Sequence, residues 1–158
     1  MQLPDDWVKV EQDDPDLSSL ILFTPPDDQR AQLGFYYRGI PISPRSGEKF
    51  RNLLQQNSGV LSGEQVDELH EVLGDLAAVD EFVLSSVSTF VLNGRTVLLV
   101  EGSWVSTKYD SYELLIDAGQ GGAVVQQVYF VAPSARFDAL LPTITSCIAT
   151  IDWVTLGD

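Results

Sequence analysis

The sequence predicts an α+β fold, in which an antiparallel sheet of about six strands is flanked by helices in an α/β/α sandwich. Three observations lead to this prediction. Short segments rich in β-branched and aromatic residues fill residues 1–40 and return in residues 82–131. Two amphipathic helical patterns lie between these groups, and a third follows them. The length of 158 residues, without a linker-like change in composition, predicts that residues 1–158 form a single globular domain.

The first strands are short and are separated by turn residues. They are expected at residues 7–10, 20–23 and 33–38. Proline lacks the backbone N–H that a sheet ladder needs, so Pro25 and Pro26 end the second strand. Gly39 closes the third strand, and residues 40–44 (IPISP) are expected to form a connector.

Two helices are predicted next. Ser46 is the expected N-cap of the first helix, which ends at residues 57–59 (NSG). The second helix begins at Ser62, where Gln65 gives the spacing of a capping box. Apolar residues recur at helical spacing in both segments, namely Phe50, Leu53, Leu54, Val66, Leu69, Leu73 and Leu76. Each helix should therefore pack on another element, and the sheet that follows is expected to be that element.

A β-hairpin is the clearest local prediction. Residues 82–92 and 96–105 are rich in Val, Leu, Phe, Ser and Thr, and Asn93, Gly94 and Arg95 separate them. Asn and Gly both tolerate the positive φ angles that a type I′ turn requires.

A glycine cluster near residue 120 either binds a phosphate or forms a turn. Gly119, Gly121 and Gly122 do not complete a G-x-G-x-x-G pattern, because Val124 stands at the third glycine position. No Lys-Ser or Lys-Thr pair follows, as a P-loop requires. Residues 112–117 and 123–131 on either side are β-rich, so the glycines are interpreted as a hairpin loop.

The last predicted helix begins at Ser134, its expected N-cap. Its apolar positions are Phe137, Leu140, Leu141, Ile144, Ile148 and Ile151. Pro142 lies inside this pattern and should cause a kink or a short break, because it removes one helical hydrogen bond. Cys147 is interpreted as a buried small hydrophobe and not as a reactive thiol.

The composition is acidic, with 23 acidic and 9 basic residues and a formal net charge of -14. This charge repels phosphate backbones and anionic lipid surfaces, so no nucleic-acid partner is expected. No apolar run is long enough to span a membrane. Many carboxylates lie near the start, and the candidate partner-binding residues among them are Asp13, Asp14, Asp16, Asp27 and Asp28. They either form a solubilising surface or attract a basic protein partner.

The residue sets needed for catalysis or for metal binding are missing. His70 is the only histidine, and it shares one helix with Asp67 and Glu71, which gives poor ligand geometry. Residues 13–16 (DDPD) lack the alternating ligands of an EF-hand loop. We therefore expect no metal, no cofactor and no enzymatic activity. The first residues show no signal-peptide pattern, which favours a cytoplasmic location unless a leader was removed.

Three aromatic residues form the second candidate partner-binding group: Trp104, Tyr109 and Tyr112. They lie on or between neighbouring predicted strands, with Lys108 among them. Trp and Tyr are frequent anchors at interfaces, so these residues either form an exposed recognition patch or cover a face of the sheet.

The order of the elements resembles the PsbP-like fold family, which includes the photosystem II extrinsic protein PsbP and a Ran-binding nuclear import factor. The resemblance is carried by residues 128–133 (VYFVAP), by Phe137 and Pro142 behind them, and by residues 150–153 (TIDW). These segments look like the last strand and the closing helix of that family. The resemblance implies an antiparallel sheet flanked by helices and a protein that binds other proteins without catalysis.

The sequence thus predicts a non-catalytic interaction or assembly module that meets a basic protein partner through its acidic surface. Two alternatives stay open. One is a small-molecule binder or enzyme with a carboxylate/tyrosine pocket between sheet and helices. The other is a structural subunit that forms a homodimer through exposed sheet edges or through the region of Trp104.

Overall fold

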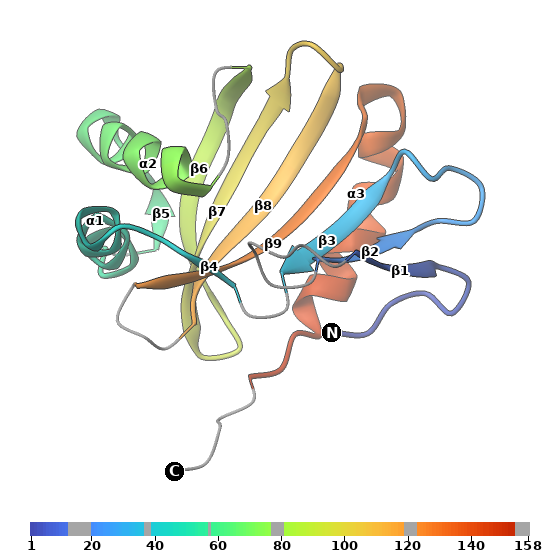
Figure 1. Cartoon of the computed structure of the whole chain (residues 1–158), viewed down its shortest axis with the longest axis horizontal. Helices are drawn as coiled ribbons and strands as arrows, with labels where there is room; N and C mark the ends of the chain where they lie inside the picture. The colour runs from blue at the N-terminus through green and yellow to red at the C-terminus, as the bar shows by residue number, and fades with distance from the viewer. Residues whose placement is uncertain (13–19, 37–38, 57, 77–80, 119–122, 154–158) are drawn as a thin grey trace.

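The structure is a computed structural model and describes residues 1–12, 20–36, 39–56, 58–76, 81–118 and 123–153 (Figure 1). These residues form one antiparallel sheet of nine strands together with three helices. The predicted α+β class is confirmed, but the sheet has more strands than the six expected. Two of its strands, β4 (Ile40–Pro41) and β5 (Gly59–Val60), have only two residues each, too few to give a period in the sequence.

The sheet brings the beginning and the end of the chain together. Its order is β1-β2-β3-β9-β8-β7-β6-β5, β4 also pairs with β9, and every pairing is antiparallel. The longer strands are β1 (Val8–Gln12), β2 (Leu20–Thr24), β3 (Gln32–Tyr36), β6 (Phe82–Leu92), β7 (Arg95–Trp104), β8 (Tyr109–Asp117) and β9 (Val124–Pro133). The three N-terminal strands therefore extend the sheet from β9, its last strand in sequence.

The hairpin predicted around Asn93 is confirmed. Only Asn93 and Gly94 lie between β6 and β7, with φ angles of 45° and 85°. Both values are positive, as a two-residue hairpin turn of this kind requires.

The glycine cluster connects two strands, as predicted. β8 and β9 are direct antiparallel neighbours, with Asp117 opposite Val125. The segment between them therefore leads into a strand and not into a helix, which a nucleotide-binding loop would need. Gly119, Gly121 and Gly122 themselves lie outside the described residues.

The first helix begins earlier than predicted. α1 (Pro44–Leu54) has Ser43 as its N-cap, and the Ser43 hydroxyl accepts a hydrogen bond from the backbone N–H of Ser46 at 3.2 Å. The expectation that Ser46 caps this helix was wrong. Pro44 explains the earlier start, because proline suits the first helical position, where no intrahelical N–H bond is needed.

The second helix, α2 (Gly63–Leu76), begins as predicted. The backbone N–H of Ser62 donates to Oε1 of Gln65 at 3.0 Å, which is the bond that a capping box makes from its fourth residue back to its first.

The last helix, α3 (Ser134–Ala149), has a different N-cap from the predicted one. Its N-cap is Pro133, and the Ser134 hydroxyl donates instead to the carbonyl of Lys108 at 3.0 Å. The helix also continues through Pro142 without the predicted break. Pro142 and Asp138, four residues before it, are both exposed, so water can bond the carbonyl that lacks its helical partner.

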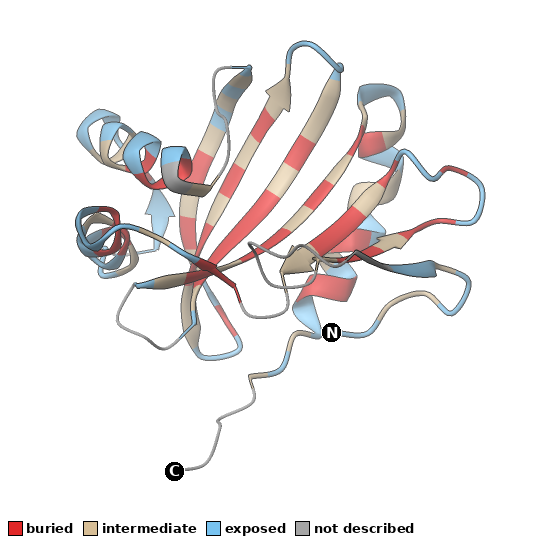
Figure 2. Cartoon of the chain, viewed as in Figure 1, coloured by how far each residue is buried: buried red, intermediate tan, exposed pale blue. Residues whose placement is uncertain are grey.

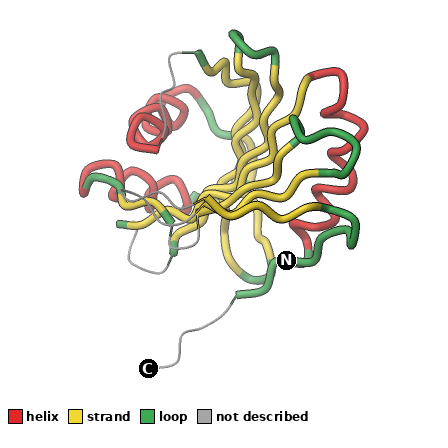
Figure 3. Tube along the Cα trace, turned by 45° about the vertical axis from the view of Figure 1, so that its right-hand side comes forward, coloured by secondary structure: helices red, strands yellow, loops and turns green. Residues whose placement is uncertain are grey.

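The helices lie on both faces of the sheet (Figure 3). Neighbouring residues of β8 show this, because Leu114 packs in the core beneath α3 whereas Leu115 packs in the core beneath α1 and α2. Buried residues concentrate along the central strands (Figure 2). The core beneath α1 and α2 has no described member from β1, β2 or β3. On that face the sheet therefore extends beyond its helices, so a sandwich of complete layers describes the fold only approximately.

Candidate functional site

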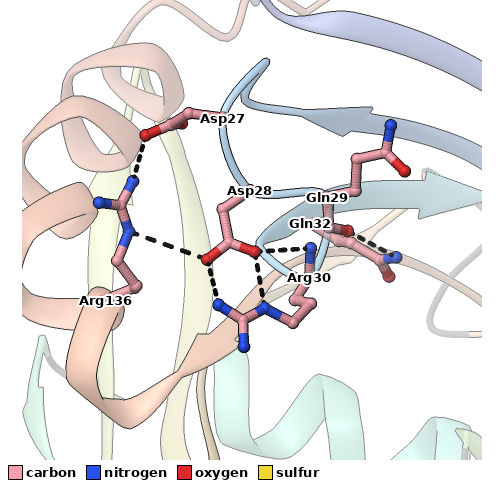
Figure 4. Close-up of polar contacts among 6 residues, drawn as sticks. All are labelled: Asp27, Asp28, Gln29, Arg30, Gln32 and Arg136. Carbon is pink, nitrogen blue, oxygen red and sulfur yellow. Dashed lines mark hydrogen bonds and ion pairs between the residues drawn. The ribbon is translucent and has the colours of Figure 1, made fainter.

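Asp28, a predicted partner-binding residue, lies in the turn between β2 and β3 and is held by Arg30 (Figure 4). Arg30 donates to the Asp28 carboxylate from Nε at 2.8 Å, from Nη2 at 2.9 Å and from its backbone N–H at 3.1 Å. Only 8% of the Asp28 side chain is exposed. Hydrogen bonding from the Arg30 side chain lowers the pKa of Asp28 below its usual value. Asp28 is therefore ionised at neutral pH, and its charge is matched within the fold.

Arg136, in the first turn of α3, joins the same cluster (Figure 4). Its Nη2 lies 2.9 Å from Oδ2 of Asp27, and its Nε lies 3.9 Å from Oδ2 of Asp28. Two carboxylates thus meet two guanidinium groups, which leaves the cluster without excess charge. The contacts fasten the β2–β3 turn to the beginning of α3, so Asp27 and Asp28 have a structural role. The other three predicted aspartates, Asp13, Asp14 and Asp16, lie outside the described residues.

The three predicted aromatic residues are divided between the two faces of the sheet. Trp104 and Tyr109 are cross-strand partners on β7 and β8, and both are half-buried. The Trp104 ring lies 5.1 Å from that of Phe82, measured between centroids. Tyr112 packs in the core beneath α3, on the opposite face, and burial raises its pKa. The three residues therefore do not form one patch.

A buried carboxylate on β8 was not singled out from the sequence. Glu113 accepts hydrogen bonds from Oγ of Ser111 at 2.6 Å and from Nε2 of Gln127 at 2.9 Å. All three residues are buried, and Glu113 is 7% exposed. Burial raises the pKa of Glu113, although both hydrogen bonds oppose the shift. The available signal was alternation, because Glu113 is two residues from Leu115 and so faces the same side of the sheet.

Tyr129 lies next to this carboxylate, directly opposite Glu113 on β9. The next cross-strand neighbours in the same direction are Gly34 on β3, opposite Tyr129, and Leu22 on β2, opposite Gly34. A Cβ atom at Gly34 would lie 2.6 Å from Cζ of Tyr129 and 2.7 Å from Cδ2 of Leu22, so glycine leaves the space that the tyrosine ring occupies. Burial raises the pKa of Tyr129. Glu113 and Tyr129 are thus a carboxylate and a phenol on the face that carries α1 and α2.

The remaining described group of acidic residues lies on α2. Leu69 and Val72 are buried, which turns the opposite side of the helix outward. Glu64 and Asp67 are exposed there, and Glu68 is half-buried. Within the described part of the chain, no ion pair involves these three carboxylates. We call Glu64, Asp67 and Glu68 the α2 acidic face.

Glu71, one turn further along α2, behaves differently. Arg45 approaches its Oε2 with Nε at 3.1 Å, and Lys49 forms a second ion pair with its Oε1. Both cations belong to α1, so Glu71 ties the two helices together. His70 is exposed beside it.

The hydroxyl, carboxylate and thiol groups of Ser111, Glu113 and Cys147 are buried in the fold. The Ser111 hydroxyl and the Glu113 carboxylate are buried and already bonded to each other. The Cys147 thiol is buried as predicted, and burial raises its pKa. Among the residues that the structure describes, no group of three or more His, Cys, Asp or Glu residues could hold a metal ion.

No protein-family model and no curated protein matches this chain. Among the described helices, none is both long and apolar enough to cross a membrane.

Proposed function

We propose that this chain is a non-catalytic interaction or assembly module that binds a basic protein partner through an acidic surface, and that the α2 acidic face is the centre of this surface. The observation that carries the proposal is the contrast between two groups of carboxylates. Asp27 and Asp28 are matched by Arg30 and Arg136. The α2 acidic face points outward, and no described cation pairs with it.

The physical basis is long-range attraction. A protein with a net charge of -14 attracts a cationic surface, and unpaired carboxylates on a rigid helix fix where that surface docks. We also propose that the chain is related to the PsbP-like family. The order of β9, which contains aromatic residues, and the closing helix α3 directly after it supports this relationship.

The experiment is affinity capture with the chain as bait, at about 50 mM and about 300 mM salt, because Coulomb contacts weaken as the Debye length shortens. Three baits are compared. They are the natural chain, a variant with Glu64→Gln, Asp67→Asn and Glu68→Gln, and a control variant with Asp5→Asn, Asp6→Asn and Asp138→Asn. The control removes the same number of charges from exposed positions outside α2.

The proposal expects one basic protein that is retained at low salt, released at high salt and lost with the α2 variant, while the control keeps it. Equal binding to the α2 variant and to the natural chain contradicts the assignment of α2. A bait with Asp13→Asn, Asp14→Asn and Asp16→Asn then tests whether the aspartates near the start carry the binding instead.

A second candidate function is a small-molecule site built from carboxylate and tyrosine. The observation that favours it is the pairing of Glu113 with Tyr129 on the face between sheet and helices. Thermal-shift screening of the natural chain against small cationic and hydrogen-bonding compounds tests it. A stabilising compound that loses its effect in Glu113→Gln supports this candidate, whereas an unchanged effect contradicts it.

A further inference from the structure

The turn between β6 and β7 contains an asparagine that is followed by glycine. Asn93 and Gly94 are both exposed, whereas Asn52 and Asn57 are followed by leucine and by serine. A backbone nitrogen can attack the side-chain amide of the preceding asparagine, and glycine hinders this attack least because it has no Cβ. A Cβ built at Gly94 would have no atom of the described residues within 4 Å, so the turn is open to water. Asn93 is therefore the asparagine of this chain at which such an attack is easiest.

The side-chain amide of Asn93 is also a structural contact. Its Nδ2 donates to the carbonyls of Ala149 at 3.1 Å and of Ile151 at 2.6 Å. The indole N–H of Trp153 donates in the other direction, to the carbonyls of Leu92 at 3.1 Å and of Asn93 at 3.0 Å. We call these four hydrogen bonds the tail contact, because they hold the segment that follows α3 on the β6–β7 turn.

We propose that Asn93 is a site of spontaneous deamidation, and that this modification releases the segment after α3 from the β6–β7 turn. The Gly94 nitrogen, after losing its proton to solvent, bonds to Cγ of Asn93. The bond from Cγ to Nδ2 breaks, and ammonia leaves with a proton taken from water. A water molecule then opens the cyclic imide at either carbonyl and gives aspartate or isoaspartate. The net reaction consumes one water and releases one ammonia, and it needs no oxidant, reductant or further reactant.

Either product removes the donor on which the tail contact depends. A carboxylate accepts hydrogen bonds but donates none, so the carbonyls of Ala149 and Ile151 lose their partner and face a negative charge instead. Isoaspartate also inserts one backbone atom into a two-residue turn whose geometry has to match the twist of β6 and β7. Because the released ammonia is lost to solvent, the original contact does not form again.

The tail contact in turn sets the rate of the modification. While Nδ2 is bonded to both carbonyls, the Asn93 side chain cannot turn its Cγ toward the Gly94 nitrogen. The reaction therefore proceeds from molecules in which the contact has opened, and the free energy of the contact determines how many these are. Neither step involves the α2 acidic face, so this inference is independent of the proposed partner binding.

Peptide mass spectrometry of the natural chain, kept for several days at mildly alkaline pH, tests the site. The peptide with Asn93 should gain about 1 Da, because an NH2 group is replaced by an oxygen function, and the peptide with Asn52 should not. The chain unfolded in guanidinium chloride gives the rate without the tail contact, and the folded chain should react more slowly. Trp153→Phe keeps an aromatic ring but loses the indole donor, so it should react about fivefold faster than the folded natural chain, which is the effect of one hydrogen bond on the opening equilibrium.

Hydrogen exchange of residues 150–153 tests the release. Asn93→Asp should exchange these backbone amides faster than the natural chain. Asn52→Asp is the control, since it adds the same charge at an exposed position of α1 and should leave the exchange unchanged. The site is overturned if Asn93 stays intact in the folded chain and in Trp153→Phe while the unfolded chain is fully converted. Equal exchange in the two aspartate variants overturns the release, and an unchanged reaction rate in Trp153→Phe overturns the control by the tail contact.

Discussion

The indole N–H of Trp153 donates to the carbonyl of Asn93 at 3.0 Å, and the Asn93 side chain donates back to the carbonyl of Ile151 at 2.6 Å. The Asn93 side chain also reaches the carbonyl of Ala149, at the end of α3. The guanidinium of Arg95 lies over the Trp153 ring, 5.0 Å from its centroid. One turn residue thus forms the β6–β7 hairpin and also fixes the segment that follows α3.

Substitutions at Asn93 should separate these two roles. Asn93→Gly keeps the positive φ but removes the side-chain donor, and should lower the free energy of unfolding by about 1 kcal/mol. Asn93→Ala also forces a Cβ-bearing residue without a polar side chain into the left-handed region, which should cost about 1 kcal/mol more. Urea unfolding of both variants measures the difference. Equal stability of the glycine variant and the natural chain would show that the side-chain bonds contribute nothing.

Glu113 predicts a pH-dependent stability. Its pKa is raised in the folded protein, so the folded state keeps a proton that the unfolded chain has released. The free energy of unfolding should therefore fall as the pH rises from the usual glutamate pKa through the raised value. Glu113→Gln removes this titration. The free energy of unfolding of the variant should therefore rise relative to that of the natural chain over that pH interval. Urea unfolding of both proteins across the acidic to neutral range measures the gain, and a pH-independent difference contradicts the prediction.

Replacement of Gly34 should have a steric cost that depends on the presence of the Tyr129 ring. Gly34→Ala places a Cβ against the Tyr129 ring and Leu22, and should destabilise the protein by about 1–3 kcal/mol. The same change in a Tyr129→Ala background should cost less, because the ring is gone. Gly74→Ala is the control: nothing lies near its Cβ position within α2, so it should stabilise by about 0.5–1 kcal/mol. A double-mutant cycle from urea unfolding gives the coupling, and additive effects would rule out the close contact.

The ionised Asp28 carboxylate should stabilise the folded protein at neutral pH, and this contribution should be lost in acid. Because Arg30 lowers the pKa of Asp28, its contribution is present at neutral pH and disappears as the pH falls below the usual aspartate value through the lowered one. Asp28→Asn should therefore lower the melting temperature at pH 7 more than Asp27→Asn does, since Asp27 is 65% exposed. The difference between Asp28→Asn and the natural chain should shrink at about pH 2.5. Thermal melting at both pH values tests this, and an equal deficit at both would refute the assigned pKa direction.

Local patterns predicted the elements better than their contacts. The Asn93 and Gly94 turn and the pairing of Ser62 with Gln65 depend on residues within a few positions, and both were predicted correctly. The start of α1 was predicted wrongly, because Ser43 and Ser46 are both suitable N-caps and lie only three residues apart. The hydrogen bond between Glu113 and Gln127 depends on strand register, and the contact of Arg136 with Asp27 joins residues that are 109 positions apart. A periodic pattern has no information about such contacts, because register is set only when the sheet assembles.

The two hydrophobic cores lie on opposite faces of the same strands. Successive residues of β8, such as Leu114 and Leu115, belong to different cores, and β7 and β9 alternate in the same way. Loss of either helical cover therefore exposes apolar side chains on strands whose other face is still packed, and it weakens the ladder that supports the opposite core. The chain should consequently melt as a single cooperative unit, and amide protons in the middle of β8 should exchange only through that global event.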